Sequence, residues 1–372
     1  MTHLKPQARL FIVSLWKYVF SESKTEGAPM LKCCIVSASL LLISLPIPAQ
    51  DCPEFLGLPD PPFPAIEVAV SGDYAYVAGG ASGWLRVIDV STPSNPTQVG
   101  IYNTPGDCVD VAVSGDYAYV ADGNAGIRVI DVSVPSDPTE VGFTEPDGQA
   151  VGVAVSGSYA YLAAGTLGLQ VINVSTPSNP IWVGYLIGIG DVRSVAVSGS
   201  YAYVAAANAG LQVIDVSTPW NPTVVGFYNA PLHTALEVAV SDSYAYVAAD
   251  TTLWVVDVLT PSNPSLAGFY YTPGNAIAVA VSGTNAYVGT GNEGLRVIDV
   301  STPSSPTELG FWDDTGIAPY TQSVAVSGSY AYAAIGPDGL AVFDITACGG
   351  ESTIFWDDFE SGDTSFWSSA VP

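Results

Sequence analysis

The chain has 372 residues, and 48% of them are apolar, which is too high a proportion for a disordered protein. Only 9 Lys and Arg residues stand against 35 Asp and Glu residues, so the formal net charge is −26. Binding to a phosphate backbone depends on Lys and Arg, so we expect no nucleic-acid partner. The same negative charge disfavours docking on anionic lipid.

The first 50 residues have the pattern of a leader that precedes the fold. Residues 1–29 carry no repeat, and we interpret them as an over-extended start or a disordered segment. In residues 30–50 a lysine, Lys32, precedes an apolar run and a Pro- and Ala-containing end, as in a secretory signal peptide. The apolar run is shorter than the roughly 20 residues of a membrane span, so we expect no span in the mature chain. A long n-region or an uncleaved anchor is the alternative.

Residues 51–348 consist of one unit that is repeated seven times. The motif Val-Ala-Val-Ser marks each unit and occurs at 68–71, 111–114, 153–156, 195–198, 238–241, 279–282 and 324–327. Each unit holds four short runs rich in Val, Ile and Tyr, which we name strands a to d in chain order. Gly, Ser, Asn and Pro separate the runs, as is typical of turns between β-strands. Four strands in about 42 residues make one propeller blade, so the sequence predicts an all-β, seven-bladed β-propeller with four-stranded blades.

The third run of each unit resembles the repeat of the LVIVD family. The matching segments are residues 85–89, 127–131, 169–173, 211–215, 253–257, 295–299 and 340–344. The resemblance implies a β-propeller in an exported or surface protein. It implies no catalytic residues, so we expect that the protein is not an enzyme.

The two ends of the repeat region complement each other. The seventh unit stops at 344–348, before a strand d, whereas residues 52–58 form an orphan segment at the other end. Aligned with residues 95–101, the orphan segment matches proline to proline and glycine to glycine. We therefore expect the N-terminal strand to complete the last blade and close the ring.

The same alignment places Cys52 and Cys348 two residues apart in one c–d turn, a separation that suits a disulfide. The bond would close a loop of nearly 300 residues and contribute on the order of 4–5 kcal/mol by loop-entropy reasoning. Two unpaired thiols are the alternative. Cys108 is then left over, and we interpret it as a small buried residue.

Two features recur in nearly every unit and suggest structural roles. The Asp that ends strand c, such as Asp89, precedes Ser/Thr-x-Pro, and its carboxylate can accept backbone N–H bonds across the turn. The tyrosine pair of strand b, such as Tyr74 and Tyr76, lies on one face of the strand, and we expect it to pack against the next blade.

The loops differ between units on one face only. The a–b and c–d loops hardly vary, whereas the b–c and d–a loops, which share the opposite face, do vary. Variable loops on a rigid scaffold are a common way to build a binding site. The candidate binding residues on this face are Asp122, Asn124, Arg193, His233, Asn292, Asp313 and Tyr320. We therefore predict an exported binding or scaffold module, a monomer with a protein or glycan partner at the cell surface.

The residue before Val-Ala-Val is expected at the mouth of the central channel. In three units it is an acid, namely Glu67, Asp110 and Glu237. Three carboxylates near one axis could hold a Ca²⁺ ion through oxygen ligands, so the cofactor is open, with Ca²⁺ as the candidate. A solvated acidic rim without a site is the alternative. With the ion, the chain would be a metal-dependent hydrolase or lactonase; a structural surface or matrix component is a third possibility.

Residues 349–372 form an aromatic and acidic tail. Its Phe-Glu-Ser-Gly-Asp-Thr-Ser-x-Trp-Ser stretch resembles a short ending of exported bacterial proteins. A sorting or docking tag, the opening strand of a further domain and a floppy tail all remain open. Together with the signal pattern, the tail favours a secreted or cell-surface location in a bacterium.

Overall fold

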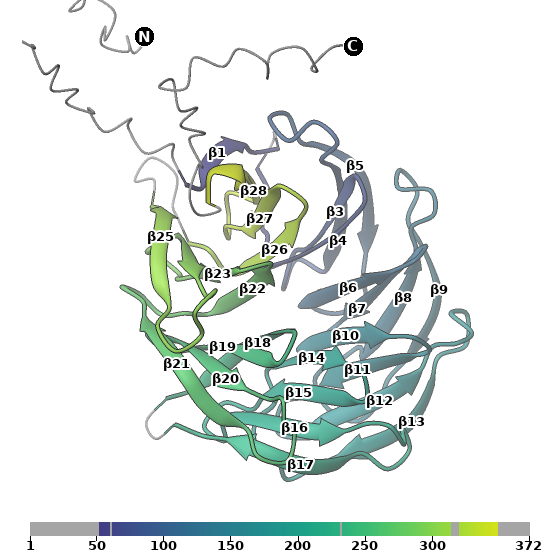
Figure 1. Cartoon of the computed structure of the whole chain (residues 1–372). Helices are drawn as coiled ribbons and strands as arrows, with labels where there is room; N and C mark the ends of the chain where they lie inside the picture. Colours follow the sequence, from purple (N-terminus) through teal and green to yellow (C-terminus); the bar gives the residue numbers. More distant parts are fainter. Residues whose placement is uncertain (1–51, 60–61, 231–232, 314–319, 349–372) are drawn as a thin grey trace, which may run out of the picture. The chain divides into compact units, whose positions relative to one another are not determined.

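The fold is a seven-bladed β-propeller, as the repeats predict (Figure 1). The structure, a computed structural model, describes residues 52–59, 62–230, 233–313 and 320–348. Within these residues, 28 strands form seven four-stranded antiparallel sheets, and one 3-10 helix, η1 (Thr346–Cys348), follows the last strand. None of the described residues forms a helix that is long and apolar enough to cross a membrane. The leader and the tail lie outside the described residues.

Strand a, with the Val-Ala-Val-Ser motif, is the innermost strand of each blade. The seven copies are β2 (Glu67–Ser71), β6 (Asp110–Ser114), β10 (Gly152–Ser156), β14 (Ser194–Ser198), β18 (Ala235–Ser241), β22 (Ala278–Ser282) and β26 (Ser323–Ser327). Each copy contacts the next around the ring, and β26 contacts β2. The ring is therefore closed at its centre.

Strands b and c are the central strands of each blade. The seven copies of strand b are β3 (Tyr74–Ala78), β7 (Tyr117–Ala121), β11 (Tyr159–Ala163), β15 (Tyr201–Ala205), β19 (Tyr244–Ala249), β23 (Asn285–Gly289) and β27 (Tyr330–Ala334). The copies of strand c are β4 (Trp84–Asp89), β8 (Ile127–Asp131), β12 (Leu169–Asn173), β16 (Leu211–Asp215), β20 (Thr252–Asp257), β24 (Leu295–Asp299) and β28 (Leu340–Asp344). The register is regular, and the first Tyr of strand b lies opposite the Asp of strand c, as Tyr117 lies opposite Asp131.

The apolar cores lie between blades rather than within them. In one core, Tyr76 and Leu85 of the first blade pack with Val120 and Ile130 of the second, and all four are buried. The same arrangement recurs around the ring, and the core that joins the last blade to the first includes Tyr332. The second tyrosine of each pair therefore packs against the next blade, as expected. Each blade completes the core of its neighbour.

Strand d is the outermost strand. Its seven copies are β5 (Thr97–Asn103), β9 (Thr139–Thr144), β13 (Ile181–Leu186), β17 (Thr223–Tyr228), β21 (Ser265–Tyr271), β25 (Thr307–Trp312) and, for the last blade, β1 (Glu54–Gly57). A β-bulge interrupts its pairing with strand c, as at Val129 and Ile130. The bulge makes the outer edge of each blade bend.

The c–d turn is held by the carboxylate that ends strand c. The Asp89 Oδ1 atom accepts hydrogen bonds from the Ser91 backbone N–H at 2.9 Å and from its hydroxyl at 2.6 Å. These bonds lower the pKa of Asp89. Asn173, the one amide in this position, accepts the Ser175 N–H in the same way, at 2.9 Å. The turn role expected for this residue is confirmed, and it does not require a charge.

Each c–d turn also touches the outer strand of the preceding blade. A methyl group placed on Gly142 of β9 would overlap the carbonyl oxygen of Pro177 in the next blade. The same clash recurs along the ring, for Gly100 with Pro135, Gly184 with Pro219, Gly226 with Pro261 and Gly268 with Pro303. At this contact only a hydrogen atom fits on the Cα atom, so glycine is required by the space rather than by φ.

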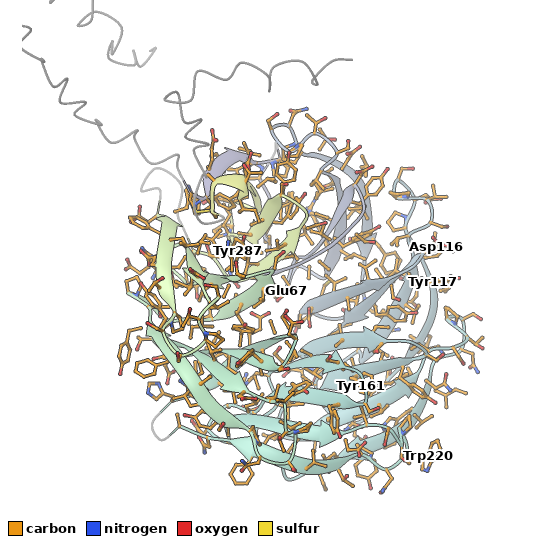
Figure 2. All side chains as sticks on the ribbon, in the orientation of Figure 1. Glu67, Asp116, Tyr117, Tyr161, Trp220 and Tyr287 are labelled. Carbon is orange, nitrogen blue, oxygen red and sulfur yellow. A yellow bond between two sulfur atoms is a disulfide. The ribbon has the colours of Figure 1, made fainter. Side chains whose placement is uncertain are left out.

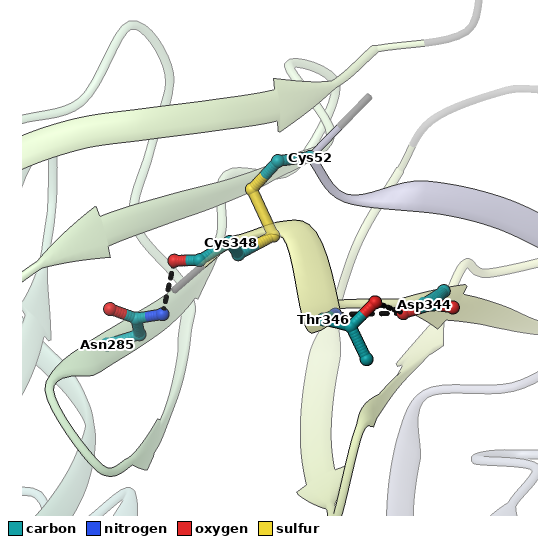
Figure 3. The surroundings of a disulfide bond; sticks show 5 residues. All are labelled: Cys52, Asn285, Asp344, Thr346 and Cys348. Carbon is teal, nitrogen blue, oxygen red and sulfur yellow. Dashed lines mark hydrogen bonds between the residues drawn. A yellow bond between two sulfur atoms is a disulfide. The ribbon is translucent and has the colours of Figure 1, made fainter. Parts of the chain in front are cut away.

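The N-terminal strand completes the last blade, as predicted. Strand β1 pairs antiparallel with β28, and Phe55 lies opposite Phe343. Cys52 and Cys348 form a disulfide with a Cα–Cα distance of 5.2 Å (Figure 3). The Asn285 side chain, which stands where other blades have Tyr, donates a hydrogen bond to the Cys348 carbonyl at 2.8 Å (Figure 3). Cys108 is free and buried, also as expected.

We predict that Gly142→Ala lowers the free energy of unfolding by about 1–3 kcal/mol, because the added methyl group must push the Pro177 carbonyl away. Urea denaturation of the purified protein measures the change. The control is Thr139→Ala on the same strand, where the side chain is exposed. Equal stability of the two variants would contradict the close approach.

We predict that replacing both Cys52 and Cys348 by Ser lowers the free energy of unfolding by about 2–5 kcal/mol, since the disulfide closes a loop spanning 296 positions. Denaturation curves with and without reductant measure the loss. Reductant should destabilise the wild type and leave the double variant unchanged. Two alkylatable thiols at these positions in untreated protein would refute the bond.

Candidate functional site

The three acids predicted at the channel mouth stand at or near the inner ends of their blades. Glu67 and Asp110 begin β2 and β6, and Glu237 lies near the start of β18. Figure 2 shows Glu67 at the centre of the ring, where the innermost strands converge. Part of each side chain is accessible, but the surrounding strands remove most water from the carboxylates. All three acids therefore lie on the innermost strands of their blades.

These carboxylates accept hydrogen bonds from the innermost strands. The two oxygens of Asp110 accept the backbone N–H groups of Val111 and Val153, each at 2.6 Å. Glu237 accepts the Val279 N–H at 2.9 Å. Val153 and Val279 belong to the next blade in each case. The innermost strand is an edge of its sheet, so some of its N–H groups have no partner within the sheet. The acids accept these N–H groups and thereby join adjacent blades.

Glu67 has different partners. It accepts the N–H of its neighbour Val68 at 3.2 Å, and it accepts the hydroxyl of Ser323 from the last blade. This second bond crosses the point where the ring closes, since Ser323 begins β26. The carboxylate thus helps to hold the first blade to the last.

The location of the acids raises their pKa values. Burial is the largest cause for each, and it raises the pKa of Asp110 to about 6 and that of Glu237 to about 8. The pKa of Glu67 is raised well above its usual range, by burial first and then by the charges of Asp110 and Glu237. Near neutral pH the three groups therefore carry less than three negative charges.

A metal centre requires several ligands around one point. Among the described residues, no group of three or more His, Cys, Asp and Glu side chains is arranged to hold a metal ion. The three carboxylates influence each other electrostatically, but their hydrogen bonds go to backbone groups of separate blades. The contacts of the three carboxylates therefore indicate a structural role in joining blades. A Ca²⁺ site at these residues remains a prediction.

The variable loops do lie together on one face. Isolated β-bridges join the b–c loop of one blade to the d–a loop that leads to the next, as Gly165 pairs with Val192 and Gly291 pairs with Thr321. Two of the predicted binding residues meet on this face. Asn292 and Tyr320 line one hollow of about 310 Å³ with Asn275 and Glu293. We call this the loop hollow.

Asp122 lies inside its loop rather than on the binding face. Its side chain is fully buried, and it accepts the Gly106 N–H at 2.9 Å. Arg128 places its Nε atom 3.6 Å from the carboxylate and donates to Glu145 at 3.0 Å. Burial raises the pKa of Asp122 in spite of these partners. Its place beside Arg128 makes it a support for two loops.

The remaining candidates lie on separate blades. Asn124 and Asp313 are exposed, and Arg193 pairs with Asp191. The His233 Nδ1 atom lies 3.9 Å from an oxygen of Asp250, and its ring meets the ring of Trp254 edge-on at 5.7 Å. The structure does not bring these four residues together.

Sequence reasoning missed a second hollow, on the outer rim. It has a volume of about 660 Å³ and lies between β13 and the c–d turn of the next blade. Trp182, Tyr185, Trp220 and Asn221 are among its lining residues, and we call it the aromatic groove. Figure 2 shows Trp220 at the outer edge of the ring. One signal was available, because Trp220 stands where the other turns have Ser.

We predict that stability falls as pH rises from about 5 to 8. In the unfolded chain Asp110 and Glu237 ionise near pH 4, whereas the folded protein keeps their protons until about pH 6 and about pH 8. Their contribution is full below pH 4 and is lost as pH rises through those values, at up to about 1.4 kcal/mol per pH unit for each group. Melting temperatures in a pH series measure it.

The matched variant is Glu237→Gln, which keeps an oxygen acceptor for the Val279 N–H but cannot ionise. It should flatten the upper part of the pH series. Asp215→Asn is the control, because the pKa of Asp215 is lowered and its contribution is lost only in acid. If the melting temperature of Glu237→Gln fell with pH as steeply as that of the wild type, the Glu237 carboxyl would not have the raised pKa in the folded protein.

Comparison with solved structures supports the fold. The WD40 repeats of RRP9 align with a TM-score of 0.63 and 14% identity, over 76% of this chain and 94% of that chain. The structure of U3-55K aligns with a TM-score of 0.63 and 13% identity, over 76% and 95%. The computationally designed Ika8 protein aligns with a TM-score of 0.56 and 14% identity, over 78% and 100%. These likenesses concern the fold alone.

The repeats identify the family. No curated protein matches the chain. The LVIVD repeat is found seven times, at residues 64–104, 105–144, 147–186, 189–230, 234–272, 273–314 and 318–348. These matches cover most of the chain and follow the seven blades. The chain belongs to the LVIVD repeat family.

Proposed function

We propose that the protein is an exported, non-enzymatic binding module that recognises its partner through the face formed by the b–c and d–a loops. The LVIVD propeller fold supports a binding or scaffold role in general. The observation that carries the proposal is the loop hollow, where three loops from two neighbouring repeats bring polar side chains together.

The loop hollow has the chemistry of a recognition site. Asn275 and Asn292 supply amide donors and acceptors, and Glu293 supplies a carboxylate. The Tyr320 ring packs between the backbones of Gly291 and Gly336, so it is held by two blades, while 39% of the residue remains exposed. A fixed aromatic ring with hydrogen-bonding groups around it suits a polar partner surface.

Export is supported by the disulfide. The Cys52–Cys348 bond joins the two ends of the described chain, and disulfides persist in oxidising compartments such as the periplasm and the cell exterior. The signal pattern in residues 30–50 agrees with this location. We therefore place the partner, a protein or a glycan, at the cell surface.

We expect the double variant Asn292→Ala, Tyr320→Ala to weaken partner binding by at least about tenfold, because it removes the ring and the amide of the loop hollow. Immobilised wild type and variant are compared for capture of surface proteins and glycans, with dissociation constants measured for the captured species. Asn95→Ala is the control, since Asn95 is exposed on the constant c–d face.

Two results would contradict the proposal. Equal binding by the wild type and the double variant would place recognition elsewhere. Saturable binding of one Ca²⁺ per chain that Glu67→Gln abolishes, measured by calorimetry, would favour the metal-dependent hydrolase or lactonase instead.

A further inference from the structure

The aromatic groove lies where the repeat departs from its own pattern. The fourth residue of the c–d turn is Ser in five of the six complete turns, at 94, 136, 178, 262 and 304, but it is Trp220 in the fourth blade. The second residue of strand d is Gln, Glu, Val or Leu in five blades and Phe55 in the last blade, but it is Trp182 in the third blade. These two tryptophans are 38 positions apart in sequence and line the same groove.

The contact between the two blades explains how they meet. Gly184 of β13 lies against the carbonyl of Pro219, which directly precedes Trp220. The tight approach of glycine and proline therefore sets the turn of the fourth blade beside the outer strand of the third. Five blade pairs have this arrangement, but only this pair has Trp on both sides.

The aromatic rings of the groove are exposed, and two of them are held by contacts along the outermost strand. Trp182, Tyr185 and Trp220 are 41%, 54% and 70% exposed. The rings of Trp182 and Tyr185 lie 5.6 Å apart and are tilted by 35°. The Trp182 indole N–H donates a hydrogen bond to the Gly184 carbonyl at 3.0 Å, which fixes the ring along the outermost strand. Trp182 and Tyr185 therefore need little further ordering to bind a ligand.

The neighbouring groove provides an internal comparison. It lies between β17 and the next c–d turn and contains Phe227, with Ser262 in the place of Trp220. Its volume is about 400 Å³, against about 660 Å³ for the aromatic groove. The scaffold is the same in both, so the larger hollow goes with the two tryptophans.

Charge restricts the ligand. Of the described residues that line the aromatic groove, none is charged, and Asn221 provides the polar side chain. The chain as a whole carries a net charge of −26, which repels anionic polymers. No acidic side chain among the described residues of the groove could pair with a cation either. A ligand that fits is therefore neutral, has apolar faces to lie on aromatic rings, and has polar groups to reach an amide and backbone atoms.

We propose that the aromatic groove binds a neutral polysaccharide. A pyranose ring has faces made of C–H bonds, which stack on Trp and Tyr rings, and a rim of hydroxyl groups, which exchange hydrogen bonds with Asn221. The groove has the size of pockets that hold small ligands, and it is open along the rim, so a longer chain can pass through it. This site lies on the third and fourth blades and is separate from the loop hollow on the sixth and seventh.

A peptide strand is the competing occupant of an outer edge. The Trp182 ring, however, lies along this edge through its bond to the Gly184 carbonyl, and it covers part of the path that an added strand would follow. A stacking ligand uses the exposed ring face, whereas an added strand requires the ring to move. The geometry therefore favours the sugar.

The test uses the purified chain and neutral probes. Cellohexaose, xylohexaose, mannohexaose and chitohexaose are titrated by calorimetry and by tryptophan fluorescence. The variants Trp220→Ser and Trp182→Gln put the residues of the other repeats in place, so both should fold. Phe227→Ala in the neighbouring groove is the matched control.

We expect saturable binding of at least one probe by the wild type and by Phe227→Ala. For each Trp variant we expect the Kd to be higher by at least about fivefold. Binding by none of the four probes would overturn the proposal, and so would equal affinity in the Trp variants. A wild-type dimer in sedimentation analysis that becomes a monomer with Trp220→Ser would assign the groove to an interface between copies and would also overturn it.

Discussion

The ring depends on the contact between the glycine of an outer strand and the c–d turn of the following blade, which in five of the seven blades is made with a proline carbonyl. At this contact the two backbones lie so close that a methyl group would overlap the carbonyl oxygen. Proline fixes the turn, and the Asp or Asn at the end of strand c holds it with hydrogen bonds. Each turn therefore has a rigid form and a fixed distance from the preceding blade. Since the apolar cores lie between blades, this spacing also sets how well each core is packed.

At the centre of the ring, the edges of the innermost strands have no neighbouring strand to pair with. In an ordinary sheet such edges invite pairing with other chains. Here Asp110 and Glu237 accept N–H groups of the following blade, and Glu67 reaches Ser323 across the closure. The acids lose hydration in this position, which raises their pKa values. The three acids resemble a metal site in the sequence, but their positions are also explained by their role as hydrogen-bond acceptors for the innermost strands.

The fold was predictable from the sequence to a large extent, because periodic patterns record strands and turns directly. The closure was predictable too, since the proline and glycine of residues 52–58 align with those of 95–101. The site was less predictable. Asp122 is buried, with its carboxylate 3.6 Å from the Arg128 Nε atom, and the residue spacing alone does not reveal this contact. The aromatic groove forms only where the third and fourth blades meet, which the sequence does not show. Trp220 replaces the Ser of the other c–d turns, and this difference is easily overlooked because these turns are otherwise nearly constant.

The shared last blade has a consequence for the order of events during synthesis. Strand β1 is made first but has no partner until β28 appears, and 296 positions separate Cys52 from Cys348. At about 5–20 residues per second, this delay is on the order of 15–60 s. The first thiol that follows Cys52 is Cys108, a wrong partner that is made long before Cys348. The fold removes it early, because Cys108 is buried in the core between the first two blades. Formation of that first core therefore protects the correct pairing of cysteines until the end of the chain arrives.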